Sequence, residues 1–453
     1  MTSGNSTQRM RDTLDAIDAW NGRLNAIVAL RDAEALLAEA AQADATEATG
    51  PLHGVPIAVK DLVRTKGIAT TLGSPLFADN VPSIDDVLAA RLKAAGAIVI
   101  GKTNVPEFGL GSHSTNPVYG VTRNPYDPSR TAGGSSGGAA AALATGMLDF
   151  ADGSDMMGSL RNPAGWNNTY SLRPTIGLVP SEPEGDVYSN TLSTLGPMAR
   201  TPRQLAQLLD VMAGPDRGQP LSRPAQPLSG QLEGATLKGI HFGLLNDWGG
   251  AFPYEDGIFE TVHDACAKMA GAGAKITAIA PPFPAAHLWQ SWTDLRSFAV
   301  ATKMRPLYED VRKRALLKPA AIWEIERGRA LSALDLQTAT SLRSEAFRAL
   351  MAVFDKVDAL ILPTAQMWPF PAEWAYPEQI GDTHMDTYHR WMEVVVPVSL
   401  LGFPAVTVPA GFSDTGLPMG MQIFAPMGSD AALLRVAEAW HRTVDFAGMA
   451  PAR

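Results

Sequence analysis

The segment GSDMMGSLR, residues 153–161, gathers polar side chains in a stretch that is otherwise small and apolar. Such clustering indicates a functional site, whereas the two methionines are typical of a hydrophobic core. Asp155 and Arg161 flank Ser159 and predict an ion pair that holds the shape of the loop. That role is compatible with a catalytic Ser159, but the segment by itself assigns the serine no chemistry.

The glycine-rich sequence GGSSG, residues 133–137, fits the GxSxG pattern of a nucleophile elbow. Under that interpretation Ser135 attacks the substrate with help from a later histidine, His384 or His389, although no feature of the sequence singles out either one. The alternative is a glycine-rich turn whose serines cap the following helix. The motif alone favours the turn.

Lys60 closes the short apolar run VPIAVK, residues 55–60, which predicts a buried strand. A lone lysine at the tip of a strand is usually solvated, and this is the favoured interpretation of Lys60 by itself. The sequence GAIVIGKT, residues 96–103, fits the P-loop pattern. We reject a phosphate site there, because the residues between its glycines form an apolar strand and a proline follows soon afterwards.

Strands alternate with helices along the chain, which predicts a single α/β/α domain over residues 1–453 with a central, mostly parallel mixed sheet flanked by helices. The expected strands are 55–60, 97–101, 175–180, 357–363 and 404–412. The expected helices are 7–42 (broken near 21–22), 83–96 (capped by Ser83), 137–146, 201–213, 256–272, 286–353 and 429–443. Residues 214–235 should form a surface connection and 366–391 a long functional loop.

The composition is that of an ordinary globular protein, with 453 residues, 46% of them hydrophobic and 18% charged. The net charge of -9 argues against a nucleic-acid binder, which needs a basic face. The single cysteine, Cys266, excludes an internal disulfide, and the histidines show no metal-binding spacing, so neither metal nor cofactor is expected. The proline-containing run 394–413 predicts buried strands rather than a membrane helix, and no secretory signal is visible, so we expect a soluble, cytoplasmic protein.

Lys60, the loop around Ser135, and Ser159 follow one another in the order found in the amidase signature family of Ser-cis-Ser-Lys hydrolases, with Ser159 standing 24 residues after Ser135. The likeness is dense over residues 52–213, thin over 214–356, and returns over 357–443. The segments that resemble the family are LHGVPIAVKD, GAIVIGKTNVPEF, NPVYGVTRNPYDPSRTAGGSSGG, GSDMMGSLRNPA, LRPTIGLVP and LLGFPAVTVPAGFSDTGLPMGMQIFAP.

The resemblance implies that Ser159 is the nucleophile, that Ser135 is a bridging serine preceded by a cis peptide bond, and that Lys60 is the base. A lysine can accept a proton only when it is neutral. Its pKa must therefore fall by about 3 units from roughly 10.4, at a cost of about 4 kcal/mol, and the apolar strand before Lys60 is a suitable setting. Attack gives an acyl-enzyme, which water then hydrolyses.

The resemblance also implies an oxyanion hole built from consecutive backbone N–H groups, which stabilise the charge that develops on the carbonyl oxygen. In this chain those groups belong to Met156, Met157, Gly158 and Ser159. The residues expected to support the loop are Asp155, Arg161 and Ser136.

Three positions depart from the family pattern, which usually has glycine where this chain has Met157, Asn168 and Ser171. A methionine does not easily adopt a positive φ, so Met157 bears on the geometry of the loop. All three changes add side chains and predict a rebuilt pocket wall or a rebuilt backing behind it.

The implied reaction is hydrolysis of a carboxamide, with carbamates and esters as further candidate substrates. Aromatic residues within 366–391 suit an apolar or aryl substrate, or they simply pack this loop against the protein. The candidate pocket residues are Gly109, Met156, Met157, Trp368 and Phe370. We expect a monomer or homodimer that acts on a small molecule, without nucleic acid or membrane.

Two other functions are compatible with the same motifs. The chain could be the glutaminase component of an amidotransferase, which would need partner subunits, and Met157 argues against it. It could instead be a catalytically inactive binding protein on the same fold. The joint presence of Lys60, Ser135 and Ser159 argues against that alternative.

Overall fold

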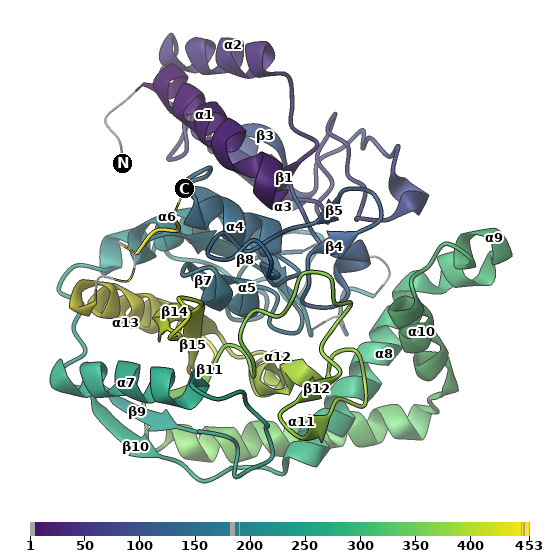
Figure 1. Cartoon of the computed structure of the whole chain (residues 1–453), viewed down its shortest axis with the longest axis vertical. Helices are drawn as coiled ribbons and strands as arrows, with labels where there is room; N and C mark the ends of the chain where they lie inside the picture. Colours follow the sequence, from purple (N-terminus) through teal and green to yellow (C-terminus); the bar gives the residue numbers. More distant parts are fainter. Residues whose placement is uncertain (1–4, 182–185, 190, 445, 447–448, 453) are drawn as a thin grey trace.

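The computed structural model describes residues 5–181, 186–189, 191–444, 446 and 449–452. Eleven strands form one continuous sheet (Figure 1). In spatial order they are β1 (Ile27–Val28), β3 (Ile98–Thr103), β2 (Pro56–Lys60), β6 (Phe150–Asp155), β8 (Thr194–Ala199), β7 (Tyr170–Arg173), β14 (Ala405–Phe412), β15 (Pro418–Phe424), β11 (Ala359–Pro363), β9 (His241–Leu244) and β10 (Lys275–Ala278). Two short strand pairs lie outside this sheet, β4 (Thr115–Asn116) with β5 (Gly120–Val121) and β12 (Gln379–Ile380) with β13 (Thr383–His384).

Helices cover both faces of the sheet. One face packs against α3 (Val87–Ala94), α6 (Pro202–Met212), α7 (Ile258–Gly271) and α13 (Asp430–Thr443). The other face packs against α1 (Ser6–Leu24), α2 (Ala33–Asp44), α4 (Gly137–Ala144), α5 (Arg161–Trp166), α8 (Ala285–Glu309), α11 (Ala333–Phe354) and α12 (Val396–Leu401). In Figure 1, α1 and α2 lie at the top, and α9 (Val311–Arg314) and α10 (Pro319–Ala330) project beside α8 on the right.

The predicted single α/β domain with a mixed sheet flanked by helices is confirmed. Parallel neighbours occur in two blocks, β3–β2–β6 and β11–β9–β10. The strands between these blocks pair antiparallel, from β6 through β8, β7, β14 and β15 to β11. In the described part of the chain, no helix is long and apolar enough to cross a membrane.

The strand expected at 175–180 is wrong. The strand is β7, which ends at Arg173, because Pro174 has no N–H to continue the ladder. The chain then turns, and the Thr175 backbone N–H donates to Asp430 Oδ1 at 2.8 Å.

Three helix boundaries also differ from the prediction. The helix expected from Ser83 begins at Val87, because the Asp86 carboxylate instead binds the Arg64 backbone N–H at 2.7 Å. The N-terminal break follows Leu24, where Asn25 adopts a left-handed φ of 52°. The region 286–353 divides into the four helices α8 to α11. The rejected P-loop is indeed part of strand β3.

Candidate active site

Lys60 is the last residue of β2 and is completely buried. Because side chains alternate along a strand, Ile57 and Val59 point into the core under α3 and α6, whereas Ala58 and Lys60 point to the face that carries α4. The solvated lysine favoured for the residue by itself is therefore wrong. The side chain instead ends among polar groups in the interior.

Three serine hydroxyls surround the amine of Lys60. Its Nζ lies 2.8 Å from Ser135 Oγ, 2.8 Å from Ser136 Oγ and 2.9 Å from Ser154 Oγ. An ammonium group has three protons to donate, so these hydroxyls satisfy it fully. A neutral amine at the same place can accept a proton from one of them.

Burial lowers the pKa of Lys60 from 10.5 to about 7, although the negative charges of Asp152 and Asp155 act in the opposite direction. The Asp152 carboxylate also fixes the end of the strand, since its Oδ1 accepts the Lys60 backbone N–H at 2.9 Å. Near neutral pH the amine is therefore neutral in a large fraction of molecules. That is the property a general base requires.

Ser154 is a partner of the lysine that the sequence analysis did not single out. It lies in β6, which runs parallel to β2 as its neighbour, so the two strands bring both residues to the same end of the sheet. Ser154 also stands in the polar segment 153–161 that the sequence marked as a functional site. That shared segment was the available signal.

Replacing Ser154 with alanine is expected to move the pH midpoint of activity downward. The hydroxyl accepts a hydrogen bond from the charged amine, and bonds to charged groups are stronger than neutral ones, so its loss destabilises the ammonium form of Lys60. The expected shift is up to about one pH unit. A pH profile of kcat/KM measures it, and an upward shift would contradict the assigned hydrogen bond.

The loop before α4 places Ser135 beside the amine. The peptide bond Gly134–Ser135 is cis, as the resemblance implied, and Ser112 Oγ donates to the Gly134 carbonyl oxygen at 2.5 Å. Ser136 occupies the N-cap position of α4 but makes no capping hydrogen bond with its side chain. The helix-capping interpretation of these serines is therefore wrong for Ser136, whose hydroxyl contacts Lys60 instead.

The two histidines considered for a nucleophile elbow lie elsewhere. His384 is exposed in β13, and His389 is buried against Trp289 and Tyr388. Among the described residues, neither histidine contacts Ser135. The hydroxyl that an elbow histidine would activate has a lysine beside it.

Ser159 lies in the turn between β6 and α5 and is 6% exposed. Its carbonyl oxygen accepts the backbone N–H of Ser136 at 3.3 Å, which ties the two serine segments together. The structure thus brings Lys60, Ser135 and Ser159 onto neighbouring segments around one buried amine.

Asp155 and Arg161 form a buried ion pair. Arg161 donates from Nε to Oδ2 at 2.9 Å and from NH2 to Oδ1 at 3.0 Å, and Asp155 also accepts the N–H groups of Gly158 and Leu160. Burial by itself would raise the pKa of Asp155. The charges of Arg161 and Arg173 together with these bonds outweigh burial and lower the pKa to about 2. The loop is therefore held by a carboxylate that stays charged at neutral pH.

Replacing Arg161 with methionine is expected to lower the free energy of unfolding by about 3–5 kcal/mol, because it leaves the Asp155 charge buried without its main partner. Urea unfolding monitored by circular dichroism measures the change. The matched control is Arg305→Met, which breaks an exposed ion pair with Glu309 and should cost less than about 1 kcal/mol. Equal losses in the two variants would contradict the assigned role of Arg161.

The predicted oxyanion donors differ in their availability. Gly158 donates its N–H to Asp155 Oδ1 at 2.9 Å, so this group is occupied within the loop. In the part of the chain that the structure describes, the N–H groups of Met156, Met157 and Ser159 have no acceptor. Gly158 carries the positive φ of the turn, 77°, so Met157 does not need one.

The three residues that replace family glycines form the backing of the nucleophile segment. Met157 is 3% exposed and packs into the core around α5. Asn168 adopts a left-handed φ of 54°, which asparagine tolerates, and its Nδ2 donates to the Phe446 carbonyl oxygen at 2.6 Å. Ser171 Oγ donates to the Leu160 carbonyl oxygen at 3.0 Å. These contacts lie behind the nucleophile segment.

Two of the candidate pocket residues border the serine cluster. A Cβ added to Gly109 would lie 3.7 Å from Ser135 Oγ and 2.7 Å from Leu62 Cδ1, so a side chain there would crowd this side of the cluster. Met156 is half-buried in the segment that precedes Ser159, unlike its buried neighbour Met157.

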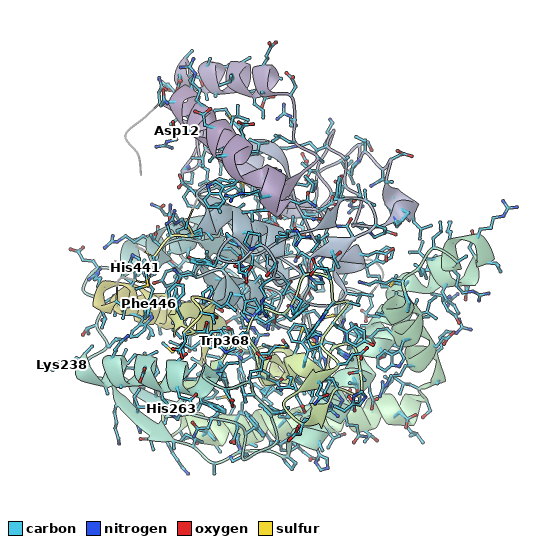
Figure 2. All side chains as sticks on the ribbon, in the orientation of Figure 1. Asp12, Lys238, His263, Trp368, His441 and Phe446 are labelled. Carbon is cyan, nitrogen blue, oxygen red and sulfur yellow. The ribbon has the colours of Figure 1, made fainter. Side chains whose placement is uncertain are left out.

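The aromatic candidates lie farther away in the fold. Trp368 packs at the start of α7, where its Nε1 donates to the Asp256 carbonyl oxygen at 3.0 Å (Figure 2). Phe370 is buried between Trp166 and Trp391. Among the described residues, no contact joins Trp368 or Phe370 to the catalytic serines, and their contact with substrate stays a prediction.

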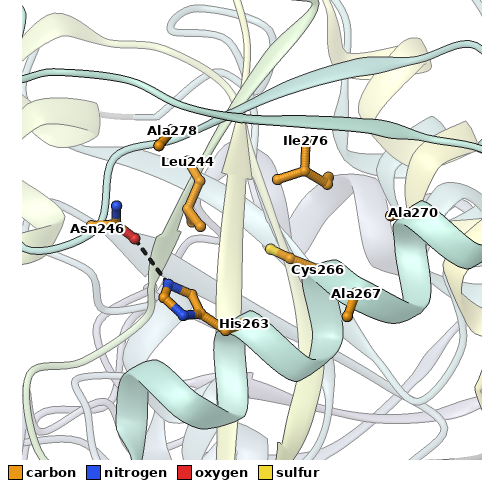
Figure 3. A pocket seen from close by; sticks show the side chains of 8 residues that line it. All are labelled: Leu244, Asn246, His263, Cys266, Ala267, Ala270, Ile276 and Ala278. Atoms are coloured by element: carbon orange, nitrogen blue, oxygen red, sulfur yellow. Dashed lines mark hydrogen bonds between the residues drawn. The ribbon is translucent and has the colours of Figure 1, made fainter.

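Two hollows lie outside the serine cluster. One of about 290 Å³ lies between α7 and the edge of the sheet (Figure 3) and is lined by Leu244, Asn246, His263, Cys266, Ala267, Ala270, Ile276 and Ala278. Burial raises the pKa of Cys266 to about 12, so its thiol is a poor nucleophile at neutral pH. A second hollow of about 460 Å³ is lined by Glu107, Thr115, Asn116, Pro117, Leu316 and Lys318. Within the described ranges, no group of three or more His, Cys, Asp or Glu side chains could hold a metal ion.

The comparison with known proteins decides the family. A family model described as Amidase matches residues 9–434. This chain belongs to the amidase signature family. An acylamidase from Rhodococcus erythropolis is 34% identical over 450 residues, covering 97% of this chain and 92% of that protein.

Other members of the amidase signature family are similar to this chain to a comparable extent. The GatA-type component of the glutamyl-tRNA(Gln) amidotransferase from Salinispora tropica is 32% identical over 475 residues, covering 95% of this chain and 92% of that protein. The crystal structure of a bacterial aryl acylamidase matches with a TM-score of 0.92 at 27% identity, covering 99% of this chain and 96% of that one. The similarity therefore supports an amide hydrolase and leaves its substrate open.

Proposed function

We propose that this chain hydrolyses carboxamides through an acyl-enzyme on Ser159, with Ser135 as the relay and Lys60 as the base. The observation that carries the proposal is the buried Lys60 amine, whose pKa is lowered to about 7 and which lies 2.8 Å from Ser135 Oγ. A group with its pKa at the operating pH is matched to general-base catalysis.

In the proposed acylation step, Ser159 Oγ attacks the amide carbon, and its proton passes through Ser135 to Lys60. The free N–H groups of Met156, Met157 and Ser159 face the developing oxyanion, where such a donor is commonly worth about 3 kcal/mol. The protonated lysine then returns the proton to the leaving amine as the C–N bond breaks. Water hydrolyses the resulting ester through the same relay in reverse.

The relay requires one contact that forms with the substrate. Among the described residues the Ser159 hydroxyl makes no hydrogen bond, whereas Ser135 already contacts Lys60. Catalytic hydrogen bonds are often long in free enzymes and tighten in the substrate complex. We therefore propose that a bound amide completes the link between the two serines.

An apolar or aryl amide is the proposed substrate class. Support comes from the similarity to an acylamidase and to a bacterial aryl acylamidase structure. Aromatic side chains also gather beyond the nucleophile segment, where Trp166 and Trp391 stack with ring centroids 5.7 Å apart. Carbamates and esters undergo the same acyl transfer and are further candidates.

The similarity to a component of glutamyl-tRNA(Gln) amidotransferases supports a second candidate function, glutamine hydrolysis within a complex. The purified chain by itself separates the two functions. Hydrolysis of a simple anilide by the lone chain, faster than that of glutamine, supports the amidase. Glutamine hydrolysis that requires added partner subunits, with no anilide hydrolysis, would contradict the amidase and support the glutaminase.

A further inference from the structure

A buried polar cluster lies beside the proposed active site, between α8, α10 and the segment after β13. Arg296 Nε donates to Glu324 Oε1 at 2.7 Å, and Arg296 NH2 donates to Tyr388 Oη at 2.8 Å. Tyr388 in turn donates to Glu324 Oε1 at 2.8 Å, and Ser297 Oγ donates to Glu324 Oε2 at 2.6 Å. These bonds fix the plane of the guanidinium group, which is 3% exposed.

The remaining nitrogen of this guanidinium faces the nucleophile segment. Arg296 NH1 has the Met156 thioether as its hydrogen-bond acceptor, with Sδ at 3.3 Å. A thioether is a weak acceptor, whereas an arginine N–H is a strong donor. Met156 is half-buried, and its unbranched side chain can change rotamer easily. An oxygen atom from a ligand would be a better partner for NH1 than the sulfur atom.

Two independent contacts place this cluster next to the reacting groups. Met156 stands three residues before Ser159 and carries one of the proposed oxyanion N–H groups. On the other side, the Tyr388 ring comes within 4.0 Å of a Cβ added to Gly111. A Cβ added to Gly109, two residues earlier, would lie 3.7 Å from Ser135 Oγ. The cluster therefore borders the serines from the Met156 side and from the segment 109–111.

The charge of the cluster narrows the kind of ligand atom that fits. The positive charge of Arg296 is already balanced by Glu324, with their side chains 3% and 0% exposed. A carboxylate placed on NH1 would add a buried charge without a partner, which is costly. A neutral carbonyl oxygen adds no charge and accepts the bond.

We propose that Arg296 is a specificity-determining residue, whose NH1 group displaces the Met156 thioether and binds a neutral carbonyl oxygen of the substrate near its scissile amide. This inference rests on the proposed amidase function and adds a polar requirement to the apolar or aryl substrate class. Glu324 and Tyr388 are positioning residues that hold the guanidinium group.

Four substrates in two matched pairs test the inference. Pentanoyl anilide and 4-oxopentanoyl anilide differ by one carbonyl in the acyl part, and the acetanilides of 3-ethylaniline and 3-acetylaniline differ by one carbonyl in the leaving group. The variant is Arg296→Lys, which keeps the charge opposite Glu324 but loses the second arm of the guanidinium fork. The matched control is Arg327→Lys, in a second arginine–carboxylate pair between α8 and α10.

In at least one pair, Arg296→Lys should lower kcat/KM of the carbonyl member by about 10- to 100-fold and that of its hydrocarbon partner by no more than about threefold. Comparing wild type with variant cancels the intrinsic reactivities of the anilides. Arg327→Lys should leave every ratio within about twofold. If Arg296→Lys does not fold, the double variant Arg296→Met/Glu324→Gln removes the pair without leaving a buried charge, and the same ratios apply.

An equal loss on carbonyl and hydrocarbon members in both pairs would overturn the role of Arg296 and leave the proposed amidase intact. A wild-type protein that hydrolyses only the hydrocarbon members would overturn it as well. Failure of the wild type to hydrolyse any of the four anilides would instead contradict the proposed function, and the inference would fall with it.

Discussion

Replacing Ser159 with alanine is expected to lower kcat/KM for an anilide by at least about 10⁴-fold, because the hydroxyl that forms the acyl-enzyme is lost. The same change should move Tm by no more than about 3 °C, since this hydroxyl makes no hydrogen bond in the described structure. Steady-state kinetics and a thermal melt measure the two effects.

The control for this experiment is Ser341→Ala, an exposed serine on α11 that should retain full activity. It shows that loss of a serine hydroxyl does not by itself affect the assay. Near-wild-type activity in Ser159→Ala would exclude the proposed nucleophile. A fall in activity matched by a large fall in Tm would mean that the serine supports the fold and does not carry the reaction.

Replacing Lys60 is expected to lower kcat/KM by about 10²- to 10⁴-fold, the usual contribution of a positioned base. Methionine has no nitrogen to accept the proton, and arginine stays protonated at every pH of interest. Both Lys60→Met and Lys60→Arg should therefore lose activity, even though Lys60→Arg keeps the positive charge among the serine hydroxyls.

The wild-type pH profile tests the same assignment. Lys60 acts as a base only when neutral, so kcat/KM should rise with pH, with a midpoint near the pKa of about 7, and level off above it. A profile that is flat between about pH 5 and 9, or substantial activity in Lys60→Arg, would contradict this role of the lysine.

The sequence predicted the strand that carries Lys60 but not the burial of its side chain. Period-two alternation places Ala58 and Lys60 on one face of β2, and a strand pattern alone does not say what covers that face. The cover is the loop before α4, which comes from a segment some 75 positions later. The family resemblance supplied this long-range information, because its motifs carry the order of lysine and serines.

Contacts between distant segments explain what the sequence did not predict. Ser154 reaches Lys60 because β6 pairs with β2, and Arg296 reaches Met156 from α8. Residues 286–353 read as one helical region, so the turns that orient Arg296 and Glu324 toward each other were invisible. The strand expected at 175–180 failed for a similar reason, because a distant carboxylate captures Thr175.

The most direct test of the central claim is the identity of the serine that reacts. The protein would be treated with a fluorophosphonate, which modifies activated serines covalently, followed by intact-mass analysis and peptide mapping. The account predicts one adduct, on Ser159, that is absent in Lys60→Ala. An adduct on Ser135 with Ser159 unmodified, or undiminished labelling of Ser159 in Lys60→Ala, would contradict it.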